Sequence, residues 1–179
     1  MPAVRALNVG GVIAYPTEAV FGLGCDPLNA QAVGRILALK RRSVDKGLIL
    51  AAAHIEQLEP WMASLNPEQR RTLETTWPGP TTWLTPASAR CPYWIRGRSE
   101  KVALRVSAHP VVAELCRRFG GPVVSTSANC AGRAPERNAH GARRRFGAAL
   151  DALVHAPVGD LAKPTEIRDL LTGDILRAA

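Results

Sequence analysis

Short apolar runs alternate along this chain with segments whose apolar residues recur at helical spacing. The β-prone runs predict strands at residues 11–15, 48–52, 81–85, 102–106, 123–124, 152–154, 166–170 and 174–177. Helical spacing, capping residues and prolines suited to a first turn predict helices at 30–42, 55–63, 67–76, 110–119 and 139–150. The elements interleave without repeats or a linker. They predict one α/β domain over residues 1–179, a single mixed sheet with flanking helices.

The segments between the predicted elements contain proline, which restricts the backbone, and glycine, which gives it more freedom. Residues 77–80 (WPGP) predict a rigid turn, and residues 87–100 predict a loop. After the first strand, Pro16 ends the ladder, while Gly22 and Gly24 permit a tight backbone approach. No Gly-Lys-Ser/Thr ending of a P-loop follows. Thr17 lies just after this first strand and has two interpretations. Its hydroxyl caps a turn, or it contacts a ligand at the carboxyl end of the strand.

The composition is that of an ordinary globular protein of 179 residues, 46% of them hydrophobic. No apolar run reaches the ~20 residues that span a bilayer, and the N-terminus lacks a signal-peptide pattern. The four cysteines are scattered without a C-x-x-C pair, and the four histidines have no metal or triad spacing. We therefore expect a cytoplasmic protein with reduced thiols and no protein-bound metal. Cys25 is interpreted as a packed thiol rather than a nucleophile.

The formal net charge is +8, from 23 Lys and Arg against 15 Asp and Glu. This excess favours anionic partners such as nucleotides, RNA or acidic proteins. Adjacent arginines recur at residues 41–42, 70–71, 117–118 and 143–145. We interpret most of them as solvated helix faces. A surface that faces RNA is the alternative, although no aromatic-rich RNA-binding motif accompanies them.

One polar segment concentrates positive charge where the first long helix is expected to end. It holds four cations within seven residues: Lys40, Arg41, Arg42 and Lys46. Asp45 is the only acid among them. Cations at a helix end complement the helix dipole, but their mutual repulsion favours an anion between them. Arg offers bidentate contacts to phosphate and Lys offers a point charge, so the segment predicts triphosphate binding.

A second polar segment follows a buried apolar pair and presents hydroxyls and an amide from Ser125, Thr126, Ser127 and Asn129. A strand-to-helix turn, with Ser127 as cap and Asn129 in a left-handed conformation, is the alternative interpretation. Arg105 stands in the middle of an apolar strand and needs a carboxylate partner, from the fold or from a substrate. The two segments together predict a nucleotide site that works by positioning and charge neutralisation.

Seven segments in one order resemble the threonylcarbamoyl-AMP synthase family, short YrdC/TsaC-like type, over essentially the whole chain. They are 15–24 (YPTEAVFGLG), 40–42 (KRR), 45–50 (DKGLIL), 77–80 (WPGP), 103–106 (ALRV), 125–129 (STSAN) and 166–169 (EIRD). The resemblance implies an open, twisted α/β sheet whose concave basic face holds ATP and L-threonine. It also implies the reaction: bicarbonate and threonine give an N-carboxy amino acid, which attacks the α-phosphorus of ATP. Threonylcarbamoyl-adenylate and pyrophosphate result, for N6-threonylcarbamoyladenosine formation at position 37 of tRNA.

The resemblance also implies which residues contact ATP. Lys40 and Arg42 match the K-x-R motif and would hold the phosphates and offset charge in the transition state. Ser127 and Asn129 match the S-x-N motif and would hold the nucleotide. Three further positions contact nucleotide in relatives: Lys101, Pro135 and Thr165. Mg²⁺ is expected only as the counterion of ATP.

Threonine would be held by Thr17, Arg105 and Ser125, with Arg105 taking its carboxylate. The family implies weak binding of tRNA or double-stranded RNA, proteins of the later threonylcarbamoyl-transfer step as partners, and no membrane. The main departure from its pattern is Ser43, where relatives usually have Pro. The alternative function is a non-catalytic RNA-binding or ribosome-assembly factor that uses the basic concave face. Such a factor would not need Thr17 or Arg105.

Overall fold

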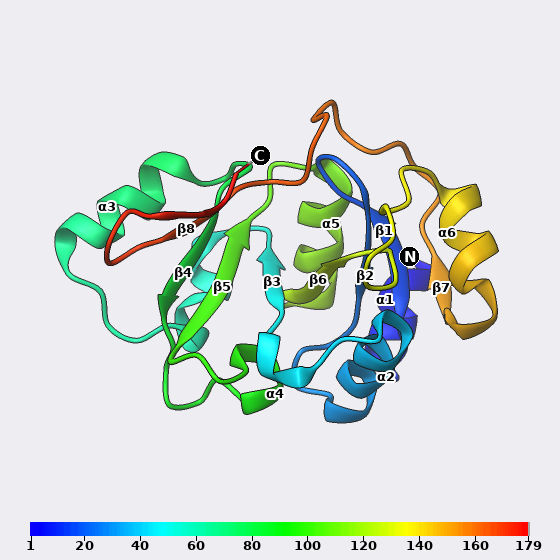
Figure 1. The fold of residues 1–179 in the computed structure, drawn as a ribbon, viewed down its shortest axis with the longest axis horizontal. Coiled ribbons are helices and arrows are strands. Elements are labelled where there is room, and N and C mark those ends of the chain that lie inside the picture. The colour runs from blue at the N-terminus through cyan, green and yellow to red at the C-terminus, as the bar shows by residue number, and fades with distance from the viewer. Residues whose placement is uncertain (179) are drawn as a thin grey trace.

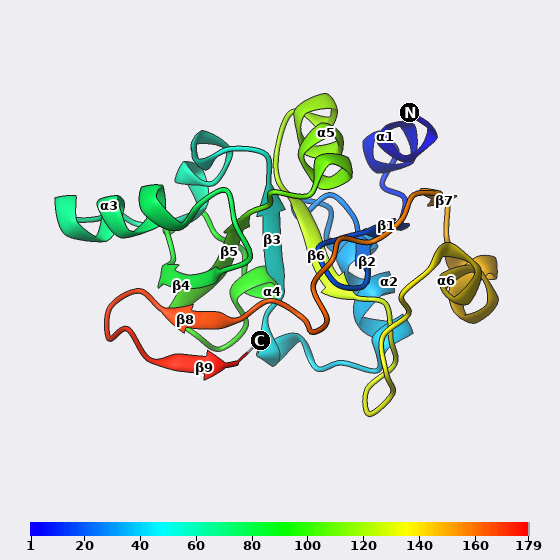
Figure 2. The ribbon, with the colours of Figure 1, turned by 90° about the horizontal axis from the view of Figure 1, so that it is seen from above.

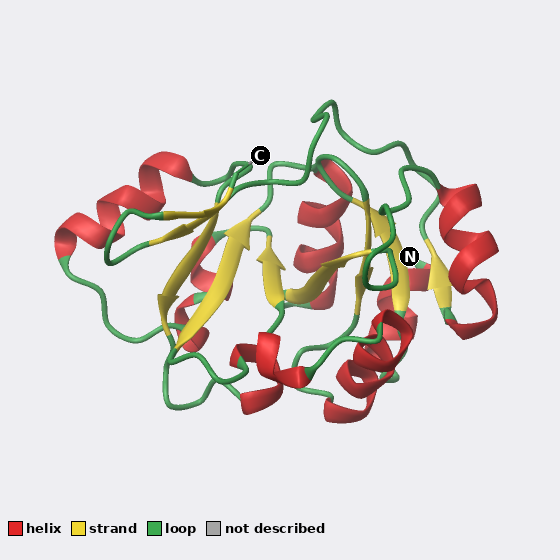
Figure 3. Ribbon diagram, viewed as in Figure 1, coloured by secondary structure: helices red, strands yellow, loops and turns green. Residues whose placement is uncertain are grey.

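The computed structural model describes residues 1–178 as α-helices and strands joined by short 3-10 turns (Figures 1 and 3). The strands are β1 (Ile13–Pro16), β2 (Phe21–Gly24), β3 (Ile49–Ala52), β4 (Thr82–Pro86), β5 (Lys101–Val106), β6 (Val123–Ser127), β7 (Ala152–Leu153), β8 (Ile167–Asp169) and β9 (Ile175–Arg177). The α-helices are α1 (Pro2–Asn8), α2 (Ala30–Lys40), α3 (Pro67–Thr76), α4 (Tyr93–Arg96), α5 (Pro110–Phe119) and α6 (Ala139–Phe146). The 3-10 turns are η1 (Val44–Lys46), η2 (Ile55–Gln57), η3 (Glu59–Trp61) and η4 (Gly147–Ala149).

The strands form one open mixed sheet in the order β7-β1-β2-β6-β3-β5-β4-β8-β9. Three neighbouring pairs run parallel, namely β1 with β7, β3 with β5, and β4 with β8. The other neighbours run antiparallel. Within the described residues the end strands β7 and β9 do not pair with each other, so the sheet is not a closed barrel. The predicted mixed α/β sheet with flanking helices is confirmed.

Alternating side chains of the strands enter two hydrophobic clusters. Val12 and Ala14 belong to one cluster, whereas Ile13 and Tyr15 belong to the other. This is the period-2 alternation of a strand that is covered on both faces. The second cluster lies under α1 and α5, which pack side by side on one side of the sheet (Figure 2).

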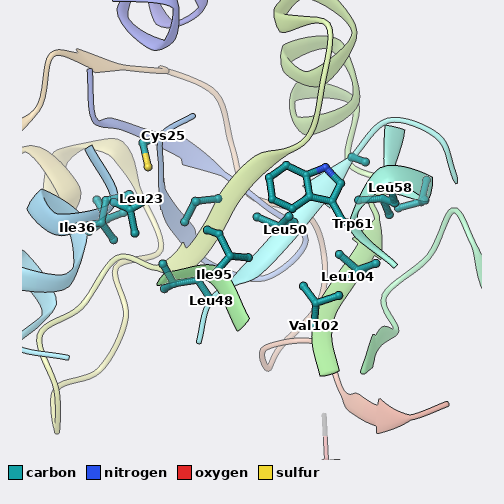
Figure 4. Packing of buried hydrophobic residues seen from close by; sticks show 14 of the residues in the cluster. Leu23, Cys25, Ile36, Leu48, Leu50, Leu58, Trp61, Ile95, Val102 and Leu104 are labelled. Atoms are coloured by element: carbon teal, nitrogen blue, oxygen red, sulfur yellow. The ribbon is translucent and has the colours of Figure 1, made fainter. Parts of the chain in front are cut away.

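The larger cluster joins the sheet to the remaining helices and turns, and Figure 4 shows its centre. Leu50 and Leu104, on neighbouring strands β3 and β5, are fully buried there beside Trp61. Replacing such a buried Leu by Ala typically costs ~2–5 kcal/mol. The sheet that carries the polar residues described below is therefore packed on a buried hydrophobic cluster.

Several predicted elements have the expected bounds. The helices at α3 and α5 begin at Pro67 and Pro110, as the prolines at their first turns indicate. Asn29 caps α2, because its side chain accepts a hydrogen bond from the backbone N–H of Ala32 (2.9 Å). The strands predicted around 48–52, 102–106 and 123–124 correspond to β3, β5 and β6.

Other predictions were wrong. Residues 55–63 do not form an α-helix but the two 3-10 turns η2 and η3. Pro60 explains this, because it lacks the N–H that a continuous α-helix needs at that position. The predicted loop 87–100 contains the short helix α4, and the helix predicted to reach residue 150 ends at Phe146. The polar residues Ser125–Ser127 continue β6 rather than forming a turn.

Two elements at the N-terminal end were not predicted, α1 and β2. Strand β2 follows β1 through a short connection and pairs with it antiparallel. Its glycines do allow a close approach, but to the fold itself: a Cβ on Gly24 would lie 2.6 Å from the Tyr15 ring and 2.7 Å from the Val124 carbonyl. A strand with two glycines has low intrinsic β-propensity, so its sequence gave little sign of a strand.

Residues 154–166 connect β7 at one end of the sheet with β8 near the other (Figure 1). On the way this segment crosses the turn after β1: Gly159 donates its N–H to the Thr17 carbonyl (2.9 Å) and Leu161 donates to the Glu18 carbonyl (3.1 Å). None of the described helices is long and apolar enough to cross a bilayer. The crossing segment brings residues of the C-terminal part next to β1.

Candidate functional site

One cavity of about 580 Å³ gathers the residues that the sequence singled out. All ten predicted site residues border it: Thr17, Lys40, Arg42, Lys101, Arg105, Ser125, Ser127, Asn129, Pro135 and Thr165. They come from both ends of the chain and from strands β5 and β6 in the middle of the sheet. The tertiary structure therefore brings into one cavity the two polar segments that are far apart in the sequence.

The lining of this cavity is strongly basic. Eight cationic residues border it: Lys40, Arg41, Arg42, Lys46, Arg96, Lys101, Arg105 and Arg177. Among the described residues, no Asp or Glu does. So many cations around one concave space repel one another and favour an anionic ligand. A cavity of this size and charge fits a nucleoside triphosphate.

Lys40 links the two polar segments directly. It is the last residue of α2, and its buried ammonium donates to the carbonyl of Asn129 (3.0 Å), to the Asn129 side-chain oxygen (3.1 Å) and to the Ser127 carbonyl. Ser127 Oγ in turn donates to Asn129 Oδ1 (2.6 Å). Burial, with Arg42 as a second cause, lowers the pKa of Lys40 to about 8. Its ammonium is thus held at the cavity by oxygens alone.

Arg42 lies two residues beyond the end of α2 and is anchored by the loop that follows. Its Nε and Nη2 donate to the Gly47 carbonyl (3.2 and 2.9 Å), and burial lowers the pKa of its guanidinium. Gly47 adopts φ +60°, and a Cβ there would lie 2.8 Å from the Arg96 carbonyl, so glycine is required. Ser43, the departure from the family pattern, caps η1 by accepting the Asp45 N–H (3.2 Å).

Arg105 has the carboxylate partner that its place in an apolar strand requires. The alternation of β5 points Val102 and Leu104 into the core, whereas Arg105 borders the cavity. Its Nη2 lies 3.3 Å from Glu18 Oε2, and its Nη1 donates to Thr165 Oγ1 (2.6 Å). The partner is therefore a residue of the fold, and both side chains are less than a tenth exposed.

Thr17 and Ser125 complete the polar wall near Arg105. The Thr17 hydroxyl donates to the Val20 carbonyl (2.7 Å), so it does cap a turn, and it borders the cavity as well. Because its hydrogen is committed, it faces the cavity as an acceptor. Ser125 is buried on β6 and also borders the cavity. The two interpretations of Thr17 are thus compatible.

The C-terminal part of the chain supplies the remaining wall. Lys101 pairs with Asp169 (2.5 Å), and Thr165 lies in the crossing segment 154–166. Arg177 was missed by the sequence analysis. On β9, it donates to the Thr165 carbonyl (2.6 Å), and burial together with Arg105 and Arg42 lowers its pKa. Its only sequence signal was a cation at the end of a short apolar strand.

The structure bears on the thiols and on metal binding too. All four cysteines are unpaired, and burial raises the pKa of the Cys25 thiol to about 12. That thiol is protonated at neutral pH and is therefore a poor nucleophile. In the part of the chain that the structure describes, no three His, Cys, Asp or Glu side chains come together as a metal-binding group.

A protein-family model named Sua5_yciO_yrdC, with the description telomere recombination, matches residues 5–179. The chain belongs to the Sua5/YciO/YrdC family. Curated relatives in this family match it at nearly full length. The threonylcarbamoyl-AMP synthase of Cellvibrio japonicus (strain Ueda107) is 55% identical over 175 residues, which is 98% of this chain and 93% of the relative. That of Halorhodospira halophila (strain DSM 244 / SL1) is 53% identical, covering 98% and 92%.

Solved structures of the family share this fold. The crystal structure of P. abyssi Sua5 complexed with L-threonine matches with a TM-score of 0.91 and 30% identity, over 98% of this chain and 52% of that longer chain. The E. coli YciO structure matches with a TM-score of 0.82 and 24% identity, over 93% of this chain and 81% of that one. The resemblance drawn from the seven sequence segments is confirmed.

Proposed function

We propose that this member of the Sua5/YciO/YrdC family is a threonylcarbamoyl-AMP synthase that acts on ATP, L-threonine and bicarbonate. One observation supports the proposal most directly. In the basic cavity the Lys40 ammonium is hydrogen-bonded to Asn129, and Ser127 and Arg105 line the same cavity. Two curated relatives of nearly the same length carry this name, and P. abyssi Sua5 has been crystallised with L-threonine.

The reaction has two steps. The threonine ammonium first loses a proton. The free amine then attacks the carbon of bicarbonate, forming a C–N bond and the carbamate as one C–O bond breaks and water leaves. A carbamate oxygen then attacks the α-phosphorus of ATP. The bond between that phosphorus and the oxygen bridging to the β-phosphate breaks, and pyrophosphate leaves with the bonding electrons. Charge spreads over phosphate oxygens in the second step, so fixed cations are the most useful catalytic groups.

The nucleotide is held by the end of α2 and the end of β6. Lys40 and Arg42 bind the phosphates and offset the charge that develops on the leaving pyrophosphate. Ser127 and Asn129 bind the nucleotide and orient Lys40, which is supported by their hydrogen bonds to its ammonium and to each other. Three further residues of the wall contact the nucleotide: Lys101, Pro135 and Thr165.

Threonine lies against the wall of Thr17, Arg105 and Ser125. The Arg105 guanidinium binds the substrate carboxylate in a buried setting, where such a pair is stronger than in water. The acceptor oxygen of Thr17 suits the amine or the hydroxyl of the substrate. A site with these polar groups rejects valine, because valine would leave them unpaired.

The chemistry of the reaction also indicates a metal ion, later partners and a cellular location. Mg²⁺ arrives with ATP as part of the substrate and neutralises phosphate charge. The adenylate is a reactive mixed anhydride, so proteins that transfer its threonylcarbamoyl group to tRNA would act next. The net charge of +8 suits weak contact with tRNA or double-stranded RNA, and a cytoplasmic location agrees with the unpaired cysteines.

The deciding experiment is pyrophosphate release by the purified chain with ATP, Mg²⁺, threonine and bicarbonate, each omitted in turn. We expect release only with the complete mixture and an adenylate product of the mass of threonylcarbamoyl-AMP. Full release without threonine would refute the proposal. No release with the complete mixture, combined with tight RNA binding, would favour the non-catalytic RNA-binding factor instead.

A further inference from the structure

The cations of the cavity differ in the charge of their partners. Lys40, Arg42 and Arg177 donate to carbonyl, amide and hydroxyl oxygens, which carry no net charge. Arg105 and Lys101 instead face carboxylates, Glu18 at 3.3 Å and Asp169 at 2.5 Å. Among the described residues, the cavity therefore has cations without a carboxylate partner (uncompensated cations) and cations that a carboxylate compensates.

The two compensated pairs are not equivalent. The side chain of Lys101 is 27% exposed, so solvent screens its pair with Asp169. The side chains of Arg105 and Glu18 are 6% and 9% exposed. In such a buried place a charge acts on its neighbours with little screening. The negative charge of Glu18 therefore reaches whatever ligand Arg105 binds.

Glu18 is held in place from behind the cavity wall. The Ser107 hydroxyl donates to its Oε1 (2.6 Å), and its own backbone carbonyl accepts the N–H of Leu161. Glu18 does not border the cavity, whereas Arg105 does. The carboxylate is thus fixed behind the guanidinium, where it modifies the charge of the subsite without touching a ligand.

Without a carboxylate partner, Arg105 would bind phosphate groups as readily as the carboxylate of threonine. Arg105 and Arg177 donate to the same residue, to Thr165 Oγ1 (2.6 Å) and to the Thr165 carbonyl (2.6 Å), and Arg42 borders the same cavity. A polyphosphate bound at Arg42 and Arg177 would therefore find the Arg105 guanidinium close by. Threonine is a zwitterion with no net charge, so it competes poorly with phosphate for an uncompensated arginine.

We propose that Glu18 is a specificity-determining residue that reserves Arg105 for a zwitterionic amino acid by excluding phosphate from it. The buried carboxylate repels a dianion or polyanion at Arg105. It affects threonine little, because the repulsion of the substrate carboxylate is offset by attraction of its ammonium. This inference rests on the proposed function, in which Arg105 binds threonine.

The test compares Glu18→Gln with the unaltered protein, using sulfate as the probe against threonine at constant ionic strength. Pyrophosphate release is measured at fixed, saturating MgATP to obtain the inhibition constant of sulfate, and at varied MgATP to obtain the KM for ATP. We expect the inhibition constant of sulfate, competitive with threonine, to fall about tenfold or more in Glu18→Gln. The KM for ATP should change less than about twofold, because the uncompensated cations are untouched. If Glu18 had only a structural role, its replacement would not strengthen the inhibition by sulfate while leaving the KM for ATP nearly unchanged.

Two further variants keep the test decisive. Glu114→Gln makes the same change in an exposed pair on α5, where Glu114 faces Arg118 at 2.5 Å, and should leave sulfate inhibition unchanged. Ser107→Ala removes the hydrogen bond to Glu18 but keeps the carboxylate charge. It should therefore shift sulfate inhibition in the same direction but less, which also covers the case of a Glu18→Gln variant that does not fold.

The outcomes separate this inference from the proposed function. Unchanged sulfate inhibition in a folded Glu18→Gln variant, or an equal change in Glu114→Gln, would overturn the role of Glu18. Absence of threonine-dependent pyrophosphate release in the unaltered protein would instead refute the function. Calorimetric titration of threonine and of sulfate into both proteins then still measures the selectivity of the subsite, with the same expected shift toward sulfate.

Discussion

Lys40 is a buried cation at the end of α2, and its charge changes with pH near neutrality. Burial lowers its pKa to about 8, with a smaller effect of Arg42. The ammonium is charged below that pH and loses its proton above it. We therefore expect the Kd for MgATP, measured without threonine, to rise about tenfold between pH 7 and pH 9.5. Calorimetric titration gives this profile without interference from the threonine amine.

The matched variant for this pH profile is Lys40→Arg, whose guanidinium stays charged over the whole range. Its ATP affinity at pH 7 can be lower, because a longer side chain must fit among Ser127 and Asn129. The slope with pH should nevertheless disappear. An unaltered protein with a flat profile to pH 9.5 would show that Lys40 keeps its proton or does not contact the nucleotide.

Neighbouring cations in the segment after α2 should differ in their effect on catalysis. Lys40→Ala and Arg42→Ala each remove a proposed phosphate contact and should lower kcat/KM by roughly 10²–10³, or ~2–4 kcal/mol. Arg41 is exposed and left-handed (φ 51°) at the C-cap of α2. Arg41→Gly removes its side chain without backbone strain, so activity should fall less than about threefold. Equal losses in all three variants would mean that the segment acts only as diffuse charge.

At the scale of elements, the β8–β9 hairpin brings Leu176 and Arg177 of the C-terminal part to the wall of the cavity. Arg177 on β9 is anchored by the Thr165 carbonyl, and no carboxylate within residues 1–178 pairs with it. Arg177→Ala should raise the KM for ATP about tenfold and leave the KM for threonine nearly unchanged. Steady-state kinetics with each substrate varied in turn measures both constants.

The hairpin offers its own control for that variant. Arg168 on β8 pairs with Glu166 at 3.1 Å and does not border the cavity. Arg168→Ala therefore removes a cation from the same hairpin without removing one from the site. If Arg168→Ala raised the KM for ATP as much as Arg177→Ala, the effect would belong to the hairpin rather than to the Arg177 guanidinium.

At the scale of the whole molecule, helix α6 and the β8–β9 hairpin lie at opposite ends of the sheet (Figure 1). Arg143 and Arg144 are exposed on α6 and do not border the cavity, so RNA binding there can be separated from catalysis. We expect the double variant Arg143→Glu with Arg144→Glu to weaken tRNA binding at low salt and to keep threonine-dependent pyrophosphate release. Binding titrations at several salt concentrations measure the affinity and its salt slope.

Arg145 is left unchanged in this variant for a structural reason. It pairs with Glu136 at 2.6 Å, and the Glu136 side chain is mostly buried, so a glutamate at 145 would place two carboxylates together. Joint loss of tRNA binding and of catalysis in a folded double variant would indicate that α6 belongs to the catalytic machinery. RNA binding that resists salt and depends on sequence would support the non-catalytic alternative.

The sequence by itself determined most helices and strands, because apolar periodicity, capping residues and prolines act locally. Pro67, Pro110 and Asn29 marked helix starts that the structure has at those positions. The same local logic failed at β2, where glycines lower strand propensity, and at 55–63, where Pro60 outweighed the apolar pattern. The ten candidate site residues were also identified from charge, hydroxyl groups and family resemblance, and all of them border one cavity.

Only the tertiary structure decided which groups face each other. Glu18 and Arg105 are 87 residues apart in the chain, and no local pattern joins them, yet they form a buried ion pair at the cavity wall. Arg177 likewise enters the site because β9 pairs with β8 at the sheet edge, a long-range contact that periodicity does not encode. The charge and hydrogen-bonding groups of a single side chain can be read from the sequence. Which other side chain pairs with it depends on the order of the strands in the sheet and on the crossing of segment 154–166 over the turn after β1.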